Sequence, residues 1–359
     1  MKLIIAVPSI LALVYRAWSR KSLTPVGIVA AVLTAVVHAM HPSSAPFALL
    51  VAFFLAGTYV TKVKHDVKSR LTISSSGSVG GEAPRTHVQV LANSVVASIL
   101  IFLDTRRLYQ LGQVESHCFP SRGDILMIGV VANYTAVAAD TFSSELGILS
   151  KSQPRLITSW SLRKVPPGTN GGVTIAGFLA AALGAFIIGV TSLLLPFCST
   201  ESQDNLPKSR FNTVWGLREK FIWILVVTIW GTLGSVLDSV LGGLLQASVV
   251  DKRTGKIVES AGGLKVLVHP GEAIITGLEE PSNREGSSIR VAEDIANIIT
   301  SKPILRERRS FSSSGELPDP EHESRKIEAG HDILDNNQVN IFMAFIMSCS
   351  AMAVAWYVL

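Results

Sequence analysis

The sequence predicts an all-α integral membrane protein: a polytopic bundle of about six to eight transmembrane helices with one partly disordered cytosolic loop. Of its 359 residues, 48% are hydrophobic and only 16% are charged, and the mean hydropathy is +0.40. The charged residues are almost absent from a series of long apolar stretches. In soluble domains about a quarter of all residues are charged, so these observations indicate a membrane protein.

Eight stretches are apolar enough to be helices in a bilayer: 3–15, 23–40, 46–61, 87–103, 125–149, 172–197, 221–250 and 339–359. Together they contain three acidic residues and no Lys or Arg. A charged side chain at the bilayer centre costs about 2.5–3.5 kcal/mol, so this partition predicts membrane crossings. The first and third stretches are short for a crossing, which leaves the count open by one or two. The stretch 221–250 is long and contains four glycines, so a broken helix is one interpretation.

The distribution of basic residues predicts the orientation. If all eight stretches cross, one face receives 24 of the Lys and Arg residues and the other receives eight. The positive-inside rule then places the first face in the cytosol and both termini on the other side. We expect an intracellular membrane such as the endoplasmic reticulum. The net charge of +5 reflects this topology, and no nucleic-acid partner is expected.

Three regions are predicted along the chain. Residues 1–277 form a multi-pass membrane domain, with a small cytosolic β-hairpin at 256–276 around Ala261-Gly262-Gly263. Residues 278–330 are rich in Ser, Pro, Glu and Arg and are predicted to be a disordered insert. Residues 331–359 form the last polar segment and the terminal transmembrane helix.

The three acids inside apolar stretches are Asp140, Glu145 and Asp238. An ionisable group inside a membrane is a functional-site hypothesis because burying it unpaired is costly. Carboxylates of this kind, with the hydroxyls of the segment ADTFSSELG, can hold a hydrated Mg²⁺. The alternative is that they pair with Lys or Arg of the loops, or lie in the headgroup region at a helix end.

The connector that follows combines basic residues with a glycine-rich turn. Lys151, Arg155 and Lys164 supply positive charge, and the turn Gly168-Thr169-Asn170-Gly171-Gly172 leads toward the next apolar stretch. Backbone N–H groups of such a turn can bind phosphate at a helix N-terminus. No Lys-Ser or Lys-Thr follows the glycines, so this is not a Walker motif. A simple turn with a helix cap is the alternative.

Amide side chains complete the candidate site. Asn93, Asn337 and Asn340 begin or precede other apolar stretches, although membrane amides often serve only as contacts between helices. The predicted topology brings all these polar clusters to the cytosolic face, whereas the opposite connections, such as 41–45, show nothing comparable. Such a site suits an enzyme that takes a soluble phosphate donor from water and a lipid from the bilayer.

Six ordered motifs resemble one known family. They are SLTPVGIVAA, QVLANS, ADTFSSELG, LITSW with KVPPGTNGGVT, GSVLDSVLG and HDILDNNQVN. They are similar to the transmembrane protein 19 family of polytopic membrane proteins, which includes the plant phytyl-phosphate kinase. The resemblance implies a multi-pass α-helical protein, and for the plant branch it implies transfer of a phosphoryl group, with CTP as donor, onto a prenyl monophosphate.

The leading hypothesis is therefore a membrane-embedded isoprenoid-phosphate kinase using CTP or another nucleotide. Asp140 and Glu145 would hold Mg²⁺, with Asp238 as a further ligand. The transferred phosphoryl group and the phosphates of nucleotide and lipid would be bound by the remaining candidates: Asn93, Lys151, Arg155, Lys164, Gly168, Thr169, Asn170, Gly171, Gly172, Asn337 and Asn340. Two alternatives stay open: a transporter or channel with a cation or proton site, and a membrane protein without catalytic activity.

Overall fold

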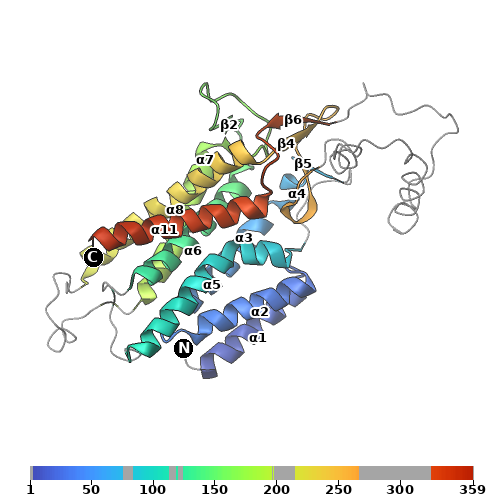
Figure 1. Cartoon of the computed structure of the whole chain (residues 1–359). Coiled ribbons are helices and arrows are strands. Elements are labelled where there is room, and N and C mark those ends of the chain that lie inside the picture. The colour runs from blue at the N-terminus through green and yellow to red at the C-terminus, as the bar shows by residue number, and fades with distance from the viewer. Residues whose placement is uncertain are drawn as a thin grey trace, which may run out of the picture. The chain divides into compact units, whose positions relative to one another are not determined.

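The computed structural model describes residues 3–75, 84–112, 119, 124–195, 197, 215–266 and 325–358. The helices that bear on the fold are α1 (Leu3–Ser19), α2 (Pro25–Met40), α3 (Ala45–Lys62), α4 (His65–Lys68), α5 (His87–Gln110), α6 (Ile125–Gly147), α7 (Ile175–Thr191), α8 (Leu217–Leu245) and α11 (Asn336–Val358). Figure 1 shows the long helices side by side, with α2 next to α5 and α1 next to α2. The all-α membrane bundle predicted from the sequence is confirmed.

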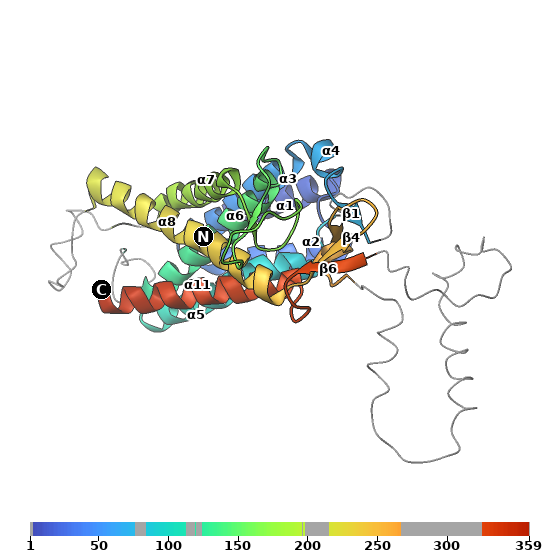
Figure 2. The same cartoon turned by 90° about the horizontal axis from the view of Figure 1, so that it is seen from above.

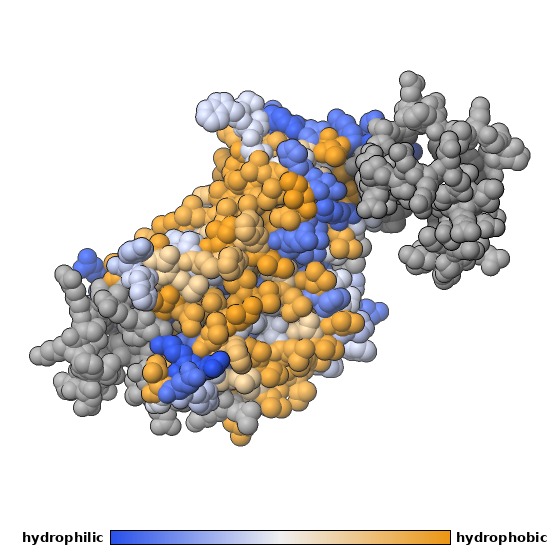
Figure 3. All heavy atoms as spheres, viewed as in Figure 1, coloured by the Kyte–Doolittle hydropathy of each residue, from blue (hydrophilic) through white to orange (hydrophobic). Residues whose placement is uncertain are grey.

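Six helices are long and apolar enough to cross a membrane: α3, α5, α6, α7 with the short turn that follows it, α8 and α11. The helices α1 and α2 are apolar but shorter. Each of the eight predicted stretches corresponds to one helix, which confirms the expected range of spans. Figure 3 shows apolar residues along the helices, with hydrophilic residues gathered chiefly at the end that carries the strands.

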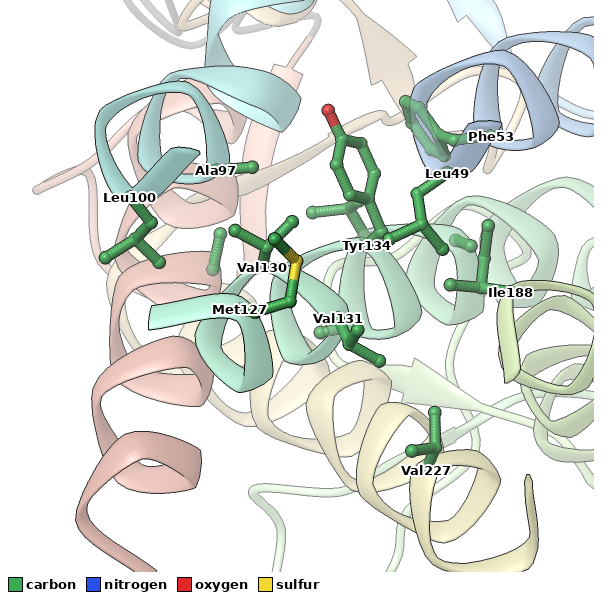
Figure 4. Packing of buried hydrophobic residues seen from close by; sticks show 14 of the residues in the cluster. Leu49, Phe53, Ala97, Leu100, Met127, Val130, Val131, Tyr134, Ile188 and Val227 are labelled. Carbon is green, nitrogen blue, oxygen red and sulfur yellow. The ribbon is translucent and has the colours of Figure 1, made fainter. Parts of the chain in front are cut away.

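The helix α6 is the centre of the bundle. In its most apolar window 72% of the residues are buried, whereas the other five spans have between 28% and 44%. It packs against α3, α5, α7, α8 and α11. Figure 4 shows Val130, Val131 and Tyr134 of α6 among side chains of these neighbours, including Phe53 of α3 and Val227 of α8. Nearly all-round apolarity is what such a central helix requires.

Small residues allow α8 to approach α6 closely. A Cβ atom added to Gly234 would lie 2.6 Å from the Cβ of Ala136, and one added to Gly231 would lie 2.8 Å from the Cβ of Thr135. Two backbones can pack this tightly only where one side lacks a side chain. The helix α8 is continuous from Leu217 to Leu245, so its glycines are packing positions and do not break it.

Short strands lie together at one end of the helices, as Figures 1 and 2 show. They are β1 (Ile73–Ser74), β2 (Arg155–Leu156), β3 (Gly172–Val173), β4 (Ser248–Asp251), β5 (Val258–Glu259) and β6 (Arg325–Ala329). They pair as β1 with β5, β2 with β3, and β4 with β6. This end therefore carries the polar chain that connects the spans.

Two sequence-based boundaries change here. A hairpin at 256–276 would pair its own two arms. Instead, β5 pairs with β1, and Ile257, just before β5, is bridged to Val250 of β4. Residues 267–276 lie outside the described part. The predicted disordered insert 278–330 is too long at its end, since residues 325–329 form β6 beside β4. The remainder of that insert lies outside the described residues.

Candidate functional site

A cavity of about 540 Å³ lies at the end of the bundle that carries the strands. All six spans contribute to its lining, three through their C-terminal ends (α3, α6 and α8) and three through their N-terminal ends (α5, α7 and α11). The lining is rich in hydroxyl, amide and carboxyl groups. It includes these sequence-predicted residues: Asn93, Asp140, Glu145, Gly168, Thr169, Asn170, Gly171, Gly172, Asp238, Asn337 and Asn340.

Asp140 and Asp238 meet because α6 and α8 run in the same direction. Ala136 of α6 contacts Gly234 of α8, and the two aspartates each follow four residues later. Four residues are about one helical turn, so both carboxyl groups project from the same contact line toward the cavity. Their carboxyl groups are close enough to interact with each other. The Oδ1 atom of Asp238 is buried without a hydrogen-bond partner in the described part of the chain.

Two carboxyl groups in contact cannot both remain charged and unpaired in a protein interior, because like charges repel strongly there. Such a pair holds either a shared proton or a cation. Oδ1 of Asn340, which lines the same cavity, is a second buried acceptor without a partner among the described residues. Oxygen-only ligands with one or two carboxylates suit a hydrated Mg²⁺. The donor set therefore fits this ion.

Glu145 is not part of this pair. Its Oε2 accepts a hydrogen bond from Nζ of Lys68 in α4, and the same ammonium donates to the carbonyl oxygen of Thr61 at 2.5 Å. Five residues separate Asp140 from Glu145, which places them about 140° apart around a helix of 3.6 residues per turn. No group of three His, Cys, Asp or Glu side chains able to hold a metal occurs in the described part of the chain. The expected metal set of three acids is thus reduced to Asp140 and Asp238.

Glu259 of β5 is an acidic residue of the cavity that the sequence did not reveal. Burial raises the pKa of Glu259, a hydrogen bond with the Thr72 side chain lowers it, and the charge of Glu145 raises it further. Its strand is placed by pairing with Ile73–Ser74. Only this long-range pairing brings Glu259 to the cavity, so no local pattern could have identified it.

The glycine-rich turn lines the cavity but differs from a phosphate loop. Gly172 N–H donates to the carbonyl oxygen of Thr169 at 2.9 Å, and Asn170 N–H donates to Oγ of Ser248 at 2.8 Å. These two donors are already used. Gly171, at φ +76°, passes so close to α8 that an added Cβ would lie 2.7 Å from Cα of Gly243. The turn therefore packs the connector between α6 and α7 against α8.

The helix that follows the turn is capped by the protein itself. The α7 helix starts at Ile175, and Oγ1 of Thr174 accepts a hydrogen bond from Gly177 N–H at 2.9 Å. This N-cap satisfies one of the free N–H groups at the start of the helix. The turn-plus-cap alternative describes this geometry.

The three amides occupy different positions around the cavity. Asn93 donates from Nδ2 to the carbonyl oxygen of Gln89 at 3.1 Å, within its own helix. Asn337 is 2% exposed and donates from Nδ2 to the carbonyl oxygen of Gly262 at 2.9 Å, which ties α11 to the turn after β5. Asn340 keeps a free Oδ1, as described above. Of the three amides, Asn340 is therefore the candidate to bind a ligand, through its Oδ1 atom.

The basic residues of the connector do not line the cavity. Lys151, Arg155 and Lys164 are exposed and absent from its lining. The Arg155 guanidinium donates to the carbonyl oxygen of Leu162 at 3.3 Å, and Arg155 is bridged through its backbone to Lys164. The expectation that these three cations surround a transferred phosphoryl group does not match this arrangement.

The cavity instead has basic residues from other segments, namely His65, Lys68, Arg85 and Lys265. Arg85 is the most informative of these. Its backbone N–H donates to the carbonyl oxygen of Ser22 at 3.0 Å, and its guanidinium donates to Oγ1 of Thr61 at 2.7 Å. None of the described carboxylates forms an ion pair with it. Arg85 directly precedes Thr86, the N-cap residue of the capping box of α5. This position is the sequence signal that could have identified Arg85 as a site residue.

The opposite end of the bundle also has a buried polar cluster, which the sequence did not lead us to expect. Asp104 of α5 accepts from Nε2 of His41 at 3.2 Å and from Nε of Arg107 at 3.0 Å. Its partners neutralise it, so it ties the C-cap of α2 to the end of α5. This cluster is a structural pairing, unlike the unsatisfied acceptors at the cavity.

Comparison with known proteins decides the family. The model of the family described as integral membrane protein DUF92 matches residues 8–348 of the chain. The chain belongs to this family. The match extends over every span that contributes to the cavity, from α3 to most of α11. The DUF92 assignment agrees with the integral, multi-pass architecture described above.

Similar curated proteins come from a plant and an archaeon. The chain is 34% identical over 284 residues to Protein PGR of Arabidopsis thaliana, covering 75% of this chain and 90% of that protein. It is 30% identical over 223 residues to Protein VTE6, chloroplastic, of the same plant, with coverage of 59% and 62%. An uncharacterised membrane protein of Methanocaldococcus jannaschii is 35% identical over 147 residues, or 41% of this chain and 52% of that one. No solved structure matches the chain.

Proposed function

We propose that this DUF92 protein is a prenyl-phosphate kinase-like enzyme that transfers a phosphoryl group from a nucleotide, CTP in the first instance, to an isoprenoid monophosphate. The single observation that carries the proposal is the contact between Asp140 and Asp238 in a polar cavity at the end of an apolar bundle. This placement suits a reaction between a water-soluble donor and a membrane lipid. The resemblance to the transmembrane protein 19 family, with its plant phytyl-phosphate kinase, supports the same chemistry.

The side chains of the cavity divide the work of such a reaction. Asp140 and Asp238 would hold Mg²⁺, with Oδ1 of Asn340 on the same ion or on its water shell. When bound, this ion neutralises charge on the donor phosphates. Arg85 supplies a fixed guanidinium for a phosphate oxygen, and its fork geometry suits two contacts at once. A prenyl monophosphate is already an anion at neutral pH, so the reaction needs no strong general base.

The proposed setting is an intracellular membrane, the endoplasmic reticulum first, with the cavity toward the cytosol. The count of basic residues supports this orientation. Nucleotides reach the cavity from the water side, and the apolar surfaces of the spans contact the isoprenoid chain.

The test uses the purified full chain in phosphatidylcholine vesicles with Mg²⁺, radiolabelled CTP or ATP, and a series of prenyl monophosphates. A labelled prenyl diphosphate is the expected product. Asp140→Asn and Asp238→Asn are each expected to lower its formation by on the order of 10²-fold or more, since each removes a charge that acts on the developing phosphoryl transfer. Glu145→Gln should lose less, because Glu145 pairs with Lys68.

The matched control is Asp66→Asn, which removes an exposed carboxylate of α4 outside the cavity and should retain the wild-type rate. Product formation by Asp140→Asn at the wild-type rate would remove the pair from the reaction. If no nucleotide is consumed with any acceptor, the kinase proposal fails. Proton or cation uptake by the same vesicles, abolished in Asp238→Asn, would then assign the pair to a carrier.

A further inference from the structure

The connector between α6 and α7 contains a tight β-hairpin, here called the connector hairpin, that spans residues 154–165. Its two arms are joined by hydrogen bonds from Leu156 N–H to the carbonyl oxygen of Arg163 at 2.9 Å and from Val165 N–H to that of Pro154 at 3.0 Å. The arms are closed by a turn in which Leu162 N–H donates to the carbonyl oxygen of Ser159 at 2.8 Å. The hairpin is thus a defined element with a fixed tip.

The tip of the connector hairpin presents apolar side chains to the outside. Trp160 is completely exposed and Leu162 is 45% exposed. Leu162 also has φ +48°, a left-handed conformation that leucine rarely adopts. The hairpin holds this strained backbone in place through the Ser159 turn and through Arg155, whose guanidinium donates to the carbonyl oxygen of Leu162. Strain of this kind persists where surrounding contacts over-determine it.

Basic side chains lie in the arms of this hairpin and just before it. Lys151, Arg155 and Lys164 are exposed, and none forms an ion pair with a carboxylate of the described residues. Arg163 behaves differently, since its Nη1 lies 2.7 Å from Oε1 of Glu328 in β6. The hairpin, together with Lys151 just before it, therefore offers a fully exposed tryptophan, an exposed leucine and three positive charges without a carboxylate partner among the described residues.

This combination is typical of a segment that lies in a membrane surface. Tryptophan favours the headgroup region, where its ring is partly apolar and its N–H can be hydrated. Lys and Arg near the surface are attracted to anionic lipids. The connector begins and ends at transmembrane helices α6 and α7, so the hairpin stays close to the bilayer. Figure 1 shows the loop beside β2 projecting outward past α7.

We propose that the connector hairpin is a membrane-surface anchor: Trp160 and Leu162 insert among the lipid headgroups, and Lys151, Arg155 and Lys164 bind anionic phospholipids. This assigns a role to the three cations that the cavity does not use, and it is independent of the proposed kinase reaction. The hairpin is directly continuous with the glycine-rich turn through the pairing of β2 with β3. Lipid contact at the tip thereby fixes one wall of the cavity relative to the membrane surface.

The test places the full chain in vesicles of phosphatidylcholine or of phosphatidylcholine with phosphatidylglycerol, each with and without lipid brominated near the headgroup end of its chains. The emission of Trp160 is the difference between wild type and Trp160→Phe. Its loss in brominated lipid, together with protection from iodide in the water phase, is the expected result. Trp356→Phe gives the reference for a tryptophan on a membrane-spanning helix.

A second experiment tests the three positive charges with the triple variant K151Q/R155Q/K164Q. Adding phosphatidylglycerol should increase quenching of Trp160 in wild type and should not do so in the triple variant. Arg163→Gln is the matched control and should respond as wild type does, because Arg163 is already paired with Glu328. Circular dichroism checks that each variant keeps its helix content.

Iodide quenching of Trp160 with no effect of brominated lipid would overturn the proposal. That outcome would mean that the tip faces water, as a site for a soluble protein partner would. An equal phosphatidylglycerol response in the wild type and the triple variant would refute the role of the three cations.

Discussion

Replacing Gly234 by alanine should force apart the two helices that carry the aspartate pair. The added Cβ would lie 2.6 Å from the Cβ of Ala136, whereas ordinary van der Waals contact begins at 3.4 Å, so α8 must move by roughly 0.8 Å or distort. Overpacking of this kind costs about 1–3 kcal/mol. The higher helix propensity of alanine offsets only about 1 kcal/mol of that.

Gly189→Ala is the matched control for this substitution. Gly189 is a buried glycine of α7 that also faces α8, but its added Cβ would meet its nearest atoms at 3.6 Å, an ordinary contact. This variant should be neutral or slightly more stable than wild type. The difference between the two variants therefore isolates the cost of the close approach, about 1–3 kcal/mol or roughly 5- to 150-fold in the unfolding equilibrium.

The assay is the free energy of unfolding of the detergent-solubilised chain, titrated with a denaturing surfactant and followed by circular dichroism. Formation of the labelled prenyl diphosphate gives a second reading, since moving α8 also separates Asp238 from Asp140. Equal stability of Gly234→Ala and Gly189→Ala would refute the packing described here.

Three further substitutions test charged groups at the cavity end. Lys68→Met leaves the partly buried Glu145 without its partner and should lower the free energy of unfolding, by up to about 3–5 kcal/mol. The double variant K68M/E145L should recover most of this loss, and no recovery would contradict the pairing. Glu259 has a raised pKa, so the folded state loses stability as pH rises above the ordinary pKa of a glutamate. Glu259→Gln should be more stable than wild type at neutral pH and equally stable in acid. Unfolding measured as a function of pH tests this. The hydrogen bond from Arg163 is the main cause of the lowered pKa of Glu328, so this pair stabilises the fold above the ordinary pKa of a glutamate, and the stabilisation is lost as pH falls through the lowered pKa. Arg163→Gln should therefore be less stable than wild type at neutral pH. A stability difference between the two proteins that stays constant down to strong acid would contradict this prediction.

The helices could be predicted from the sequence because the thickness of a bilayer fixes the length of an apolar crossing. The stretch 125–149 corresponds to α6 (Ile125–Gly147), and 339–359 corresponds to α11 (Asn336–Val358). Asp140 and Asp238 also stood out, because an acid in an apolar stretch is costly. Their contact could not be predicted, since it depends on the parallel packing of α8 on α6 through Gly234.

The basic residues show where local sequence reasoning fails. Lys151, Arg155 and Lys164 lie close along the chain to the glycine-rich turn, but the hydrogen bonds of the connector hairpin keep them outside the cavity. Lys68 and Arg85 come from segments with no apolar pattern and reach the cavity through the packing of α4 and the cap of α5. Charge counts assign a residue to one side of the membrane, and only tertiary contacts decide whether it enters a site.

The alternating directions of the six spans have an electrostatic consequence for the cavity. Three helices end there and three begin there. A helix end carries about half a negative charge and a helix start about half a positive charge, so the six macrodipoles largely cancel. The field inside the cavity is then governed by its ionisable side chains. A single charge-altering substitution, such as Asp238→Asn, should consequently change the preference of the cavity for cations over anions far more than it would at a site dominated by helix dipoles.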